Sequence, residues 1–162
     1  MFYLDLFHAL DQHGVDYLLI GGLAMNLHGV PRMTMDVDIV LALDGENLTR
    51  FIACATELGL TPQAPVPLAA LADPAQRREW IETKKLIAFA LNSTVAGTPT
   101  LDVLLVHPLD VAQSLGRAEV RAVDGIPVRL AAIEDMIRLK QAAGRRQDLD
   151  DIANLQRLRH ES

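Results

Sequence analysis

The chain has 162 residues, of which 50% are apolar, 22% are charged and only 4% are aromatic, and its formal net charge is −6. This length suits a single domain with an aliphatic core. The acidic balance argues against an evenly basic surface for nonspecific binding of nucleic acid. No apolar run approaches the roughly 20 residues that span a bilayer, and the first residues lack the layout of a signal peptide. We therefore expect a cytoplasmic protein without a membrane partner.

Hydrophobic periodicity and turn residues predict an alternation of helices and strands. In the first part we expect a helix at 1–13, a strand at 17–20, a short helix at 23–28, a strand at 35–43 and a helix at 46–58. We then expect a proline-rich loop or ordered insertion at 61–73, a helix at 75–83, antiparallel strands at 85–91 and 101–106, a helix at 109–115, a hairpin of 118–123 with 126–130, and C-terminal helices. This order predicts an α/β (α+β) fold with a mixed central sheet flanked by helices. We expect one domain over 1–162, with the sheet in 1–130 and a C-terminal helical segment at 131–162.

Two glycines and two aspartates distinguish the segment that leads from the end of the strand at 17–20 into the strand at 35–43. Gly21 and Gly22 end an apolar strand and begin a helix, where backbone N–H groups can approach an anion closely. Asp36 and Asp38 follow on the next strand, and their spacing places both carboxylates on one face. Burying them without compensation would be costly, so we interpret the pair as ligands of a divalent cation such as Mg²⁺. The alternative is a strand that starts at the surface with both aspartates in water.

Asp102 adds a third carboxylate near the start of the strand at 101–106, on the opposite face from Val103 and Leu105. If this strand lies beside the one that carries Asp36 and Asp38, three carboxylates meet around one or two metal ions. The sequence therefore predicts an acidic metal site between two strands.

Further charged residues are candidates for the same site. Arg32 and Thr34 precede the acidic strand and are expected to contact phosphate or ribose. Lys140 lies on the apolar stripe of a helix, and either aims its ammonium at a triphosphate or buries its stem with the ammonium in water. Asp148 and Asp151 lie in the first turn of the last helix, where capping and the helix dipole favour carboxylates without catalysis.

The remaining chemistry-bearing residues are interpreted structurally. Cys54 is expected to be a buried thiol and Trp80 a core anchor. His28 is expected to cap a carbonyl or shape a loop, and His107 to be incidental. A local basic patch is compatible with the net charge, with these candidates: Arg32, Lys84, Lys85, Lys140, Arg145 and Arg146. No serine-hydrolase, P-loop or Rossmann fingerprint occurs, which excludes those classes.

Gly21-Gly22, then Asp36-x-Asp38, then a single aspartate on a later strand resembles the nucleotidyltransferase superfamily of the polymerase-beta type. The string G-G-L-A-M-N-L-H-G-V-P-R-M-T-M-D-V-D is more similar to its minimal prokaryotic branch, the AbiEii-like toxin nucleotidyltransferases. The resemblance covers the first half of the chain and returns in the run of Lys140, Arg145, Asp148 and Asp151. One residue departs from the pattern of the superfamily, because Gly22 stands where a serine is usual.

The resemblance implies transfer of a nucleotidyl group from an NTP to an acceptor hydroxyl, on a tRNA 3′ end or on a protein. It also implies a partner from a toxin–antitoxin pair, either a cognate antitoxin or a toxin. Asp36 and Asp38 would bridge two Mg²⁺ (or Mn²⁺) ions, and Asp102 would hold the second ion and draw the proton from the acceptor. Gly21 and Gly22 would cradle phosphate.

Two other functions stay open at this point. One is a catalytically inactive nucleotide-binding or partner-binding protein with the same fold, which the missing serine supports. The other is a structural, antitoxin-like partner without affinity for nucleotides.

Overall fold

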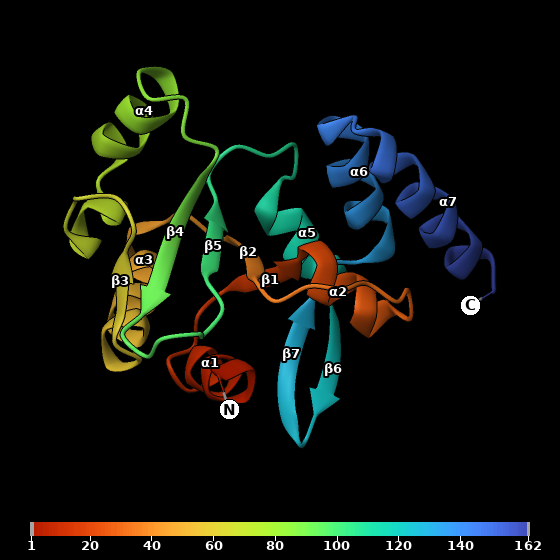
Figure 1. Cartoon of the computed structure of the whole chain (residues 1–162), viewed down its shortest axis with the longest axis horizontal. Coiled ribbons are helices and arrows are strands. Elements are labelled where there is room, and N and C mark those ends of the chain that lie inside the picture. Colours follow the sequence, from red (N-terminus) through yellow and green to blue (C-terminus); the bar gives the residue numbers. More distant parts are fainter. Residues whose placement is uncertain (1, 162) are drawn as a thin grey trace.

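The computed structural model describes residues 2–161 and contains one seven-stranded mixed sheet in the order β3-β4-β5-β2-β1-β7-β6 (Figure 1). The strands are β1 (Tyr17–Ile20), β2 (Val37–Leu41), β3 (Leu60–Pro62), β4 (Ala88–Ser93), β5 (Leu101–Leu104), β6 (Glu119–Val123) and β7 (Ile126–Leu130). The helices are α1 (Phe2–Gln12), α2 (Gly21–His28), α3 (Gly45–Glu57), the 3₁₀ turn η1 (Leu68–Ala72), α4 (Pro74–Glu82), α5 (Val111–Arg117), α6 (Ile133–Ala143) and α7 (Arg146–Glu161). The predicted α+β class is confirmed.

The centre of the sheet is formed by β5, β2 and β1. β2 runs antiparallel to β1 and parallel to β5, while β1 is parallel to β7. All four residues of β1 are buried, so this strand lies in the core, as its unbroken apolar run indicates. The outer strands β3 and β6 each pair with one neighbour.

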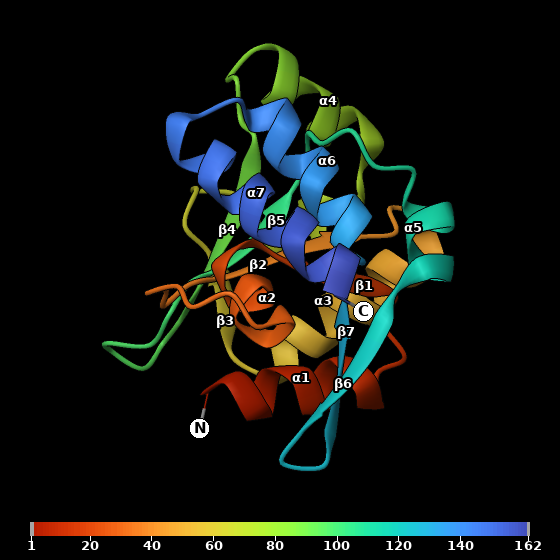
Figure 2. The same ribbon diagram turned by 90° about the vertical axis from the view of Figure 1, so that its right-hand side faces the viewer.

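The helices cover the sheet unevenly. α6 and α7 pack against each other and lie side by side in both ribbon views (Figures 1 and 2). α1 contacts β7 and lies beside the β6–β7 hairpin, away from α6 and α7 (Figure 2). The hairpin turns at Asp124 and Gly125, which have φ values of 50° and 77°, as expected for a two-residue turn that matches the twist of its strands. None of the described helices is both long enough and apolar enough to cross a bilayer.

Several expected boundaries differ from the structure: for example, α2 begins at Gly21, β5 ends at Leu104 and α5 covers Val111–Arg117. β2 begins at Val37, so Asp36 precedes the strand, because pairing with β5 starts only at Val37 and Leu101. β4 begins at Ala88 because the chain leaves α4 through a turn in which Lys85 has φ 54°. The segment at 61–73 contains the end of β3 and η1, so the alternative of a short ordered insertion fits better than a loop.

The expected structural roles of two core residues are confirmed. Trp80 is only 4% exposed and stacks on Phe89 with 5.1 Å between ring centroids. Cys54 is buried in α3, and its pKa is raised by burial to about 12. A thiol with this pKa is not a nucleophile at neutral pH.

Candidate active site

The three aspartates predicted from the sequence lie together on neighbouring strands. Asp38 on β2 is paired in register with Asp102 on β5, and the strands are parallel, so both side chains leave the same face. The two carboxyl groups lie close enough for a proton to be shared between them. Asp36, one residue before β2, is close enough for its charge to act on both. Packing thus brings together residues more than 60 positions apart in sequence.

Proximity of three carboxyl groups changes their ionisation. Burial, followed by the negative charges of Asp102 and Asp36, raises the pKa of Asp38 to about 6, although the ammonium of Lys140 acts in the opposite direction. Burial and the charge of Asp36 also raise the pKa of Asp102. Hydrogen bonding between the two carboxyl groups adds to the rise in the pKa of Asp38 and opposes the rise in the pKa of Asp102. The site therefore carries more negative charge than its surroundings balance, and a bound cation would relieve this repulsion.

The residues fit a cation by their chemistry, but their side chains are not arranged as a finished cage. Within residues 2–161, no group of three or more His, Cys, Asp and Glu side chains is placed so that it could hold a metal ion as it stands. Asp36 accepts a hydrogen bond from the backbone N–H of Thr100 at 3.2 Å, while the carboxyl groups of Asp38 and Asp102 lie against each other. Binding of a cation would require both contacts to be exchanged for metal coordination.

Gly21 allows the acidic strand to approach the first turn of α2. Its φ is 73°, and a Cβ at this position would lie 2.3 Å from Oδ2 of Asp38. Any side chain here would have to displace the carboxylate. Ile20, directly before it, is paired with Asp38 across β1 and β2, so the strand pairing itself fixes this close approach.

Gly22 is restricted by another neighbour. A Cβ on Gly22 would lie 2.8 Å from Cβ and 3.0 Å from Oγ1 of Thr34. The Thr34 hydroxyl is also 3.4 Å from the carbonyl oxygen of Asp36. A hydroxyl group therefore lies beside the first turn of α2, although residue 22 has no side chain.

An ionic cluster connects α6 and α7 to the loop before β2. Its members are the buried Lys140, Asp148 and Asp151, the partly buried Arg32 and the exposed Arg145. Lys140 contacts Asp151 at 3.0 Å and Asp148 at 3.5 Å. Arg32 contacts Asp151 at 2.5 Å. Arg145 donates from its backbone N–H and from its guanidinium to Asp148, both at 3.0 Å. The cluster joins segments separated by 119 positions in sequence.

These contacts decide several of the sequence alternatives. The alternative in which the ammonium of Lys140 lies in water is wrong, because the residue is 9% exposed and ion-paired. Asp148 accepts a hydrogen bond from the backbone of Arg145 at the start of α7, in agreement with the capping interpretation. Asp151 instead forms ion pairs with side chains. These cations oppose the effect of burial and lower the pKa of both aspartates.

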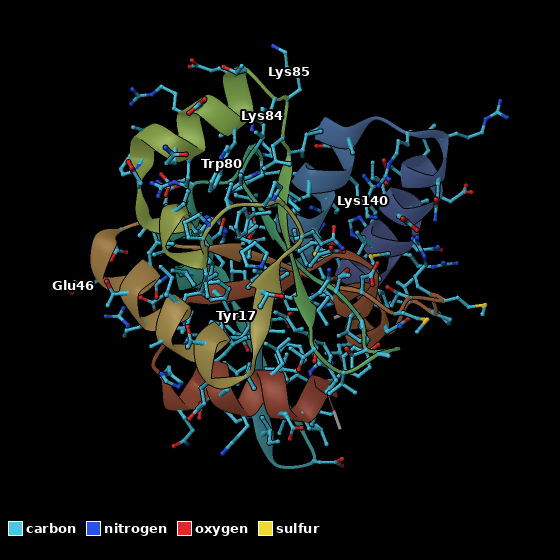
Figure 3. All side chains as sticks on the ribbon, turned by 60° about the vertical axis from the view of Figure 1, so that its left-hand side comes forward. Tyr17, Glu46, Trp80, Lys84, Lys85 and Lys140 are labelled. Atoms are coloured by element: carbon cyan, nitrogen blue, oxygen red, sulfur yellow. The ribbon has the colours of Figure 1, made fainter. Side chains whose placement is uncertain are left out.

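The predicted basic patch does not form as one surface. Three of its residues, Arg32, Lys140 and Arg145, are paired with carboxylates. Lys84 and Lys85 are exposed at the end of α4, apart from Lys140 (Figure 3).

A cleft of about 710 Å³ opens beside the aspartates. Gly21 and Asp38 line it, and so does Lys140 from α6. The rest of the lining is mostly apolar and includes Ile87 and Val106. Its size is that of an ordinary small-molecule site.

The sequence analysis did not predict the apolar part of this cleft. Ile87 and Val106 were part of expected strands, and His107 was considered incidental, yet all three line the cleft. The alternation of Asp102 and Leu104 on one face of β5, continued by Val106 beyond its end, is the available signal in the sequence. Of the two histidines, His28 has the expected structural role, because its Nε2 lies 2.8 Å from the carbonyl oxygen of Ala131.

Comparison with solved structures identifies the fold. No protein-family model matches the chain, and no curated protein gives a significant match. The crystal structure of ANT(2'')-Ia in complex with adenylyl-2''-tobramycin has a TM-score of 0.57 at 19% identity, over 95% of this chain and 84% of that one. TM1012 from Thermotoga maritima, provisionally assigned as a nucleotidyltransferase, has a TM-score of 0.55 at 15% identity, over 97% and 89%.

A third similar structure is the antigenic nucleotidyltransferase-like protein of Paracoccidioides brasiliensis, with a TM-score of 0.50 at 22% identity, over 94% of this chain and 74% of that one. At these identities the similarity concerns architecture, and substrates do not follow from it. The three comparisons cover 95%, 97% and 94% of this chain at TM-scores of 0.50 or above, so the chain has a nucleotidyltransferase-like fold.

Proposed function

We propose that the protein transfers a nucleotidyl group from an NTP to an acceptor hydroxyl, with two Mg²⁺ or Mn²⁺ ions as cofactors. One observation carries this proposal: Asp36, Asp38 and Asp102 converge beside a glycine turn, and Asp38 and Gly21 line an open cleft. The similarity to nucleotidyltransferase structures supports it. Such ions would neutralise the triphosphate and stabilise the attacking and leaving oxygens.

The chain's own residues would bind and orient the substrates. Asp36 and Asp38 would be shared ligands, and Asp102 would accept the proton of the acceptor hydroxyl at one carboxylate oxygen. The backbone N–H groups of Gly21 and Gly22, at the positive end of α2, would contact phosphate oxygens.

Three further side chains would support phosphate binding. The Thr34 hydroxyl lies beside the same turn of α2, where it would replace the absent serine hydroxyl. Lys140, on the wall of the cleft, would contribute positive charge, and Arg32 would do so from the loop before β2. In this structure both cations are paired with Asp151, so direct contact with phosphate would require them to share or leave that carboxylate.

The acceptor would be a tRNA 3′ end or a partner protein, and the reaction would belong to a toxin–antitoxin pair in the cytoplasm. These proposals rest on the resemblance to AbiEii-like proteins.

Transfer of label from α-labelled NTPs to RNA or protein, with and without Mg²⁺, tests the proposal. We expect Asp38→Asn and Asp102→Asn to reduce transfer by at least about 100-fold. Asp150→Asn, which changes an exposed aspartate of α7, should leave transfer unchanged. Equal transfer by Asp38→Asn and the wild type would exclude this mechanism. Tight NTP binding by the wild type without any Mg²⁺-dependent transfer would instead indicate the alternative of an inactive nucleotide-binding protein.

A further inference from the structure

The two outer strands of the sheet differ in how their free edges are protected. β3 has three residues and contains Pro62, which has no N–H group to offer to a further strand. β6 has five residues and no proline, and within residues 2–161 it pairs with β7 alone. The hairpin of β6 and β7 projects from the body of the protein (Figures 1 and 2). The edge of β6 is therefore open to another chain.

The register of the hairpin decides which backbone groups lie on this free edge. Val123 and Ile126 flank the two-residue turn, and in such a hairpin this pair and every second pair after it exchange hydrogen bonds. The pairs between them, such as Ala122 with Pro127, exchange none. Pro127 has no N–H group, which agrees with this pattern. The N–H and C=O groups of Val120 and Ala122 therefore point away from β7.

The side chains of β6 alternate between the two faces of the hairpin. Val120, on one face, is 65% exposed. Glu119 and Arg121 lie on the other face, where the Glu119 carboxylate is 3.3 Å from Nδ1 of His28 and the Arg121 guanidinium donates to the carbonyl oxygen of Leu27. The contact of Arg121 is with an uncharged group, so its positive charge can still attract a carboxylate.

The charges of β6 are complementary to those of a second β6. When two copies pair antiparallel about Val120, Glu119 of each copy lies opposite Arg121 of the other, so two pairs of opposite charge form. The outward N–H and C=O groups of Val120 bond to those of the same residue in the second copy. The N–H of Ala122 in each copy lies opposite the carbonyl oxygen of Ala118 in the other, which adds two further hydrogen bonds.

The same charges disfavour the neighbouring registers. A pairing centred on Arg121 would place the two copies of this arginine opposite each other, and like charges in that position are destabilising. A pairing centred on Ala122 would place both Glu119 and Arg121 opposite uncharged residues. The charges therefore favour the pairing about Val120.

We propose that the free edge of β6 binds the β6 edge of a second copy of this chain, as a symmetric antiparallel pair centred on Val120. The sheet then continues through both copies, and the same surface is used on each side of the twofold axis. Because one pair of strands buries little surface, the dimer is expected to be weak. The inference does not depend on the proposed function, since none of the residues that line the cleft belongs to β6.

Sedimentation equilibrium over about 5 µM to 1 mM measures this association. Glu119→Arg and Arg121→Glu each turn both charge pairs into like pairs, so each variant alone should dimerise at least about tenfold more weakly than the wild type. An equimolar mixture of the two variants should recover the wild-type affinity, because residues 119 and 121 then have opposite charges across the heterodimer. Loss of the contacts with His28 and Leu27 within one chain would not be reversed by mixing.

Glu82→Arg and Arg78→Glu are the matched controls. Both residues are exposed on α4, apart from β6, and their reversal changes the net charge in the same way (Figure 1). Neither control should alter dimerisation, alone or mixed. Val120→Lys is a second test, because it places like charges opposite each other at the centre of the interface and leaves Glu119 and Arg121 intact. It should abolish the dimer, and thermal unfolding checks that each variant is folded.

Hydrogen exchange identifies the edge directly. The amide protons of Val120 and Ala122 should exchange more slowly at about 1 mM than at about 10 µM, whereas that of Arg121, which is bonded within the hairpin, should change little. A wild type that stays monomeric at about 1 mM would overturn the inference. So would a dimer that the two β6 charge reversals weaken no more than the controls do, or one with unchanged exchange at Val120 and Ala122, because a different surface would then form it.

Discussion

The side chain of Thr34 occupies the space into which a side chain on residue 22 would project. A Cβ built on Gly22 lies 2.8 Å from the Thr34 Cβ, which is closer than packed carbon atoms approach. Thr34 can therefore take this position only because residue 22 has no side chain. Residue 22 has no serine hydroxyl, but the hydroxyl of Thr34, from the loop before β2, lies beside the same turn of α2.

This relationship predicts a non-additive pair of substitutions. Gly22→Ser should destabilise the protein by about 1–3 kcal/mol through overpacking. Thr34→Gly should remove the clash, so the double variant should lose less stability than the sum of the single changes. Chemical denaturation of the four proteins gives the coupling energy. Gly116→Ala, with open space around its position, controls for the effect of adding a methyl group, and additive free energies would contradict the predicted contact.

The acidic centre was predictable from sequence because it depends on local rules. Alternation along a strand places Asp102 opposite Val103, and the glycine pair after an apolar run marks the turn. The sequence does not indicate that β2 and β5 are neighbouring strands. The structure shows that they are, with Asp38 paired to Asp102. Strand pairing of this kind is strongly constrained when the other face of each strand is apolar.

The partners of the cations were not predictable in the same way. Arg32 and Asp151 are 119 positions apart, and the residue pattern of neither segment indicates that it contacts the other. The contact depends on how α6 and α7 pack beside the loop before β2, and on the burial of Lys140 between two carboxylates. The wall of Ile87 and Val106 was missed for a similar reason, since it depends on register beyond the ends of the strands.

Asp38 predicts an unusual pH dependence of stability in the absence of a divalent cation. Its pKa is raised to about 6 in the folded protein, whereas an unfolded aspartate has a pKa of about 3.9. Folding therefore favours the protonated form, and the contribution of this group is fully present below pH 4 and is lost as pH rises to 6. In metal-free buffer, Asp38→Asn should be more stable than the wild type above pH 6.

Thermal unfolding of the wild type, Asp38→Asn and Asp150→Asn from pH 4 to pH 8 measures this effect. The gain from Asp38→Asn should appear between pH 4 and pH 6 and then stay constant, while Asp150→Asn should follow the wild type. A gain of equal size at pH 4 and pH 8 would show that ionisation of Asp38 is not its cause.

The ionic cluster predicts the opposite pH dependence: its contribution to the stability of the folded protein decreases as pH is lowered. The pKa values of Asp148 and Asp151 are lowered, because their cation partners outweigh the effect of burial. Their contribution is present above the unfolded pKa and is lost as pH falls through the folded pKa. Asp151→Asn removes one carboxylate from beside Lys140 and Arg32, and should cost about 1–3 kcal/mol at pH 7.

Urea denaturation at pH 7 and at pH 3 tests the cluster, with Asp150→Asn as the exposed control on the same helix. The loss caused by Asp151→Asn should shrink at the lower pH, where the wild-type carboxylate also begins to take up a proton. If Asp151→Asn and Asp150→Asn have equal effects at pH 7, the contacts of Asp151 with Arg32 and Lys140 do not contribute to stability.

Addition of Mg²⁺ should reverse the destabilisation that Asp38 causes. A cation that binds only the folded protein stabilises it by an amount that grows with its concentration above Kd, and carboxylates must lose their protons before they bind a metal. The increase in melting temperature with Mg²⁺ should therefore be small at pH 5 and larger at pH 7.5, on the two sides of the pKa of Asp38. Asp38→Asn and Asp102→Asn should each abolish most of the increase, while Asp150→Asn should retain it. An increase that is the same at both pH values, or that persists in Asp38→Asn, would assign Mg²⁺ to a different part of the surface.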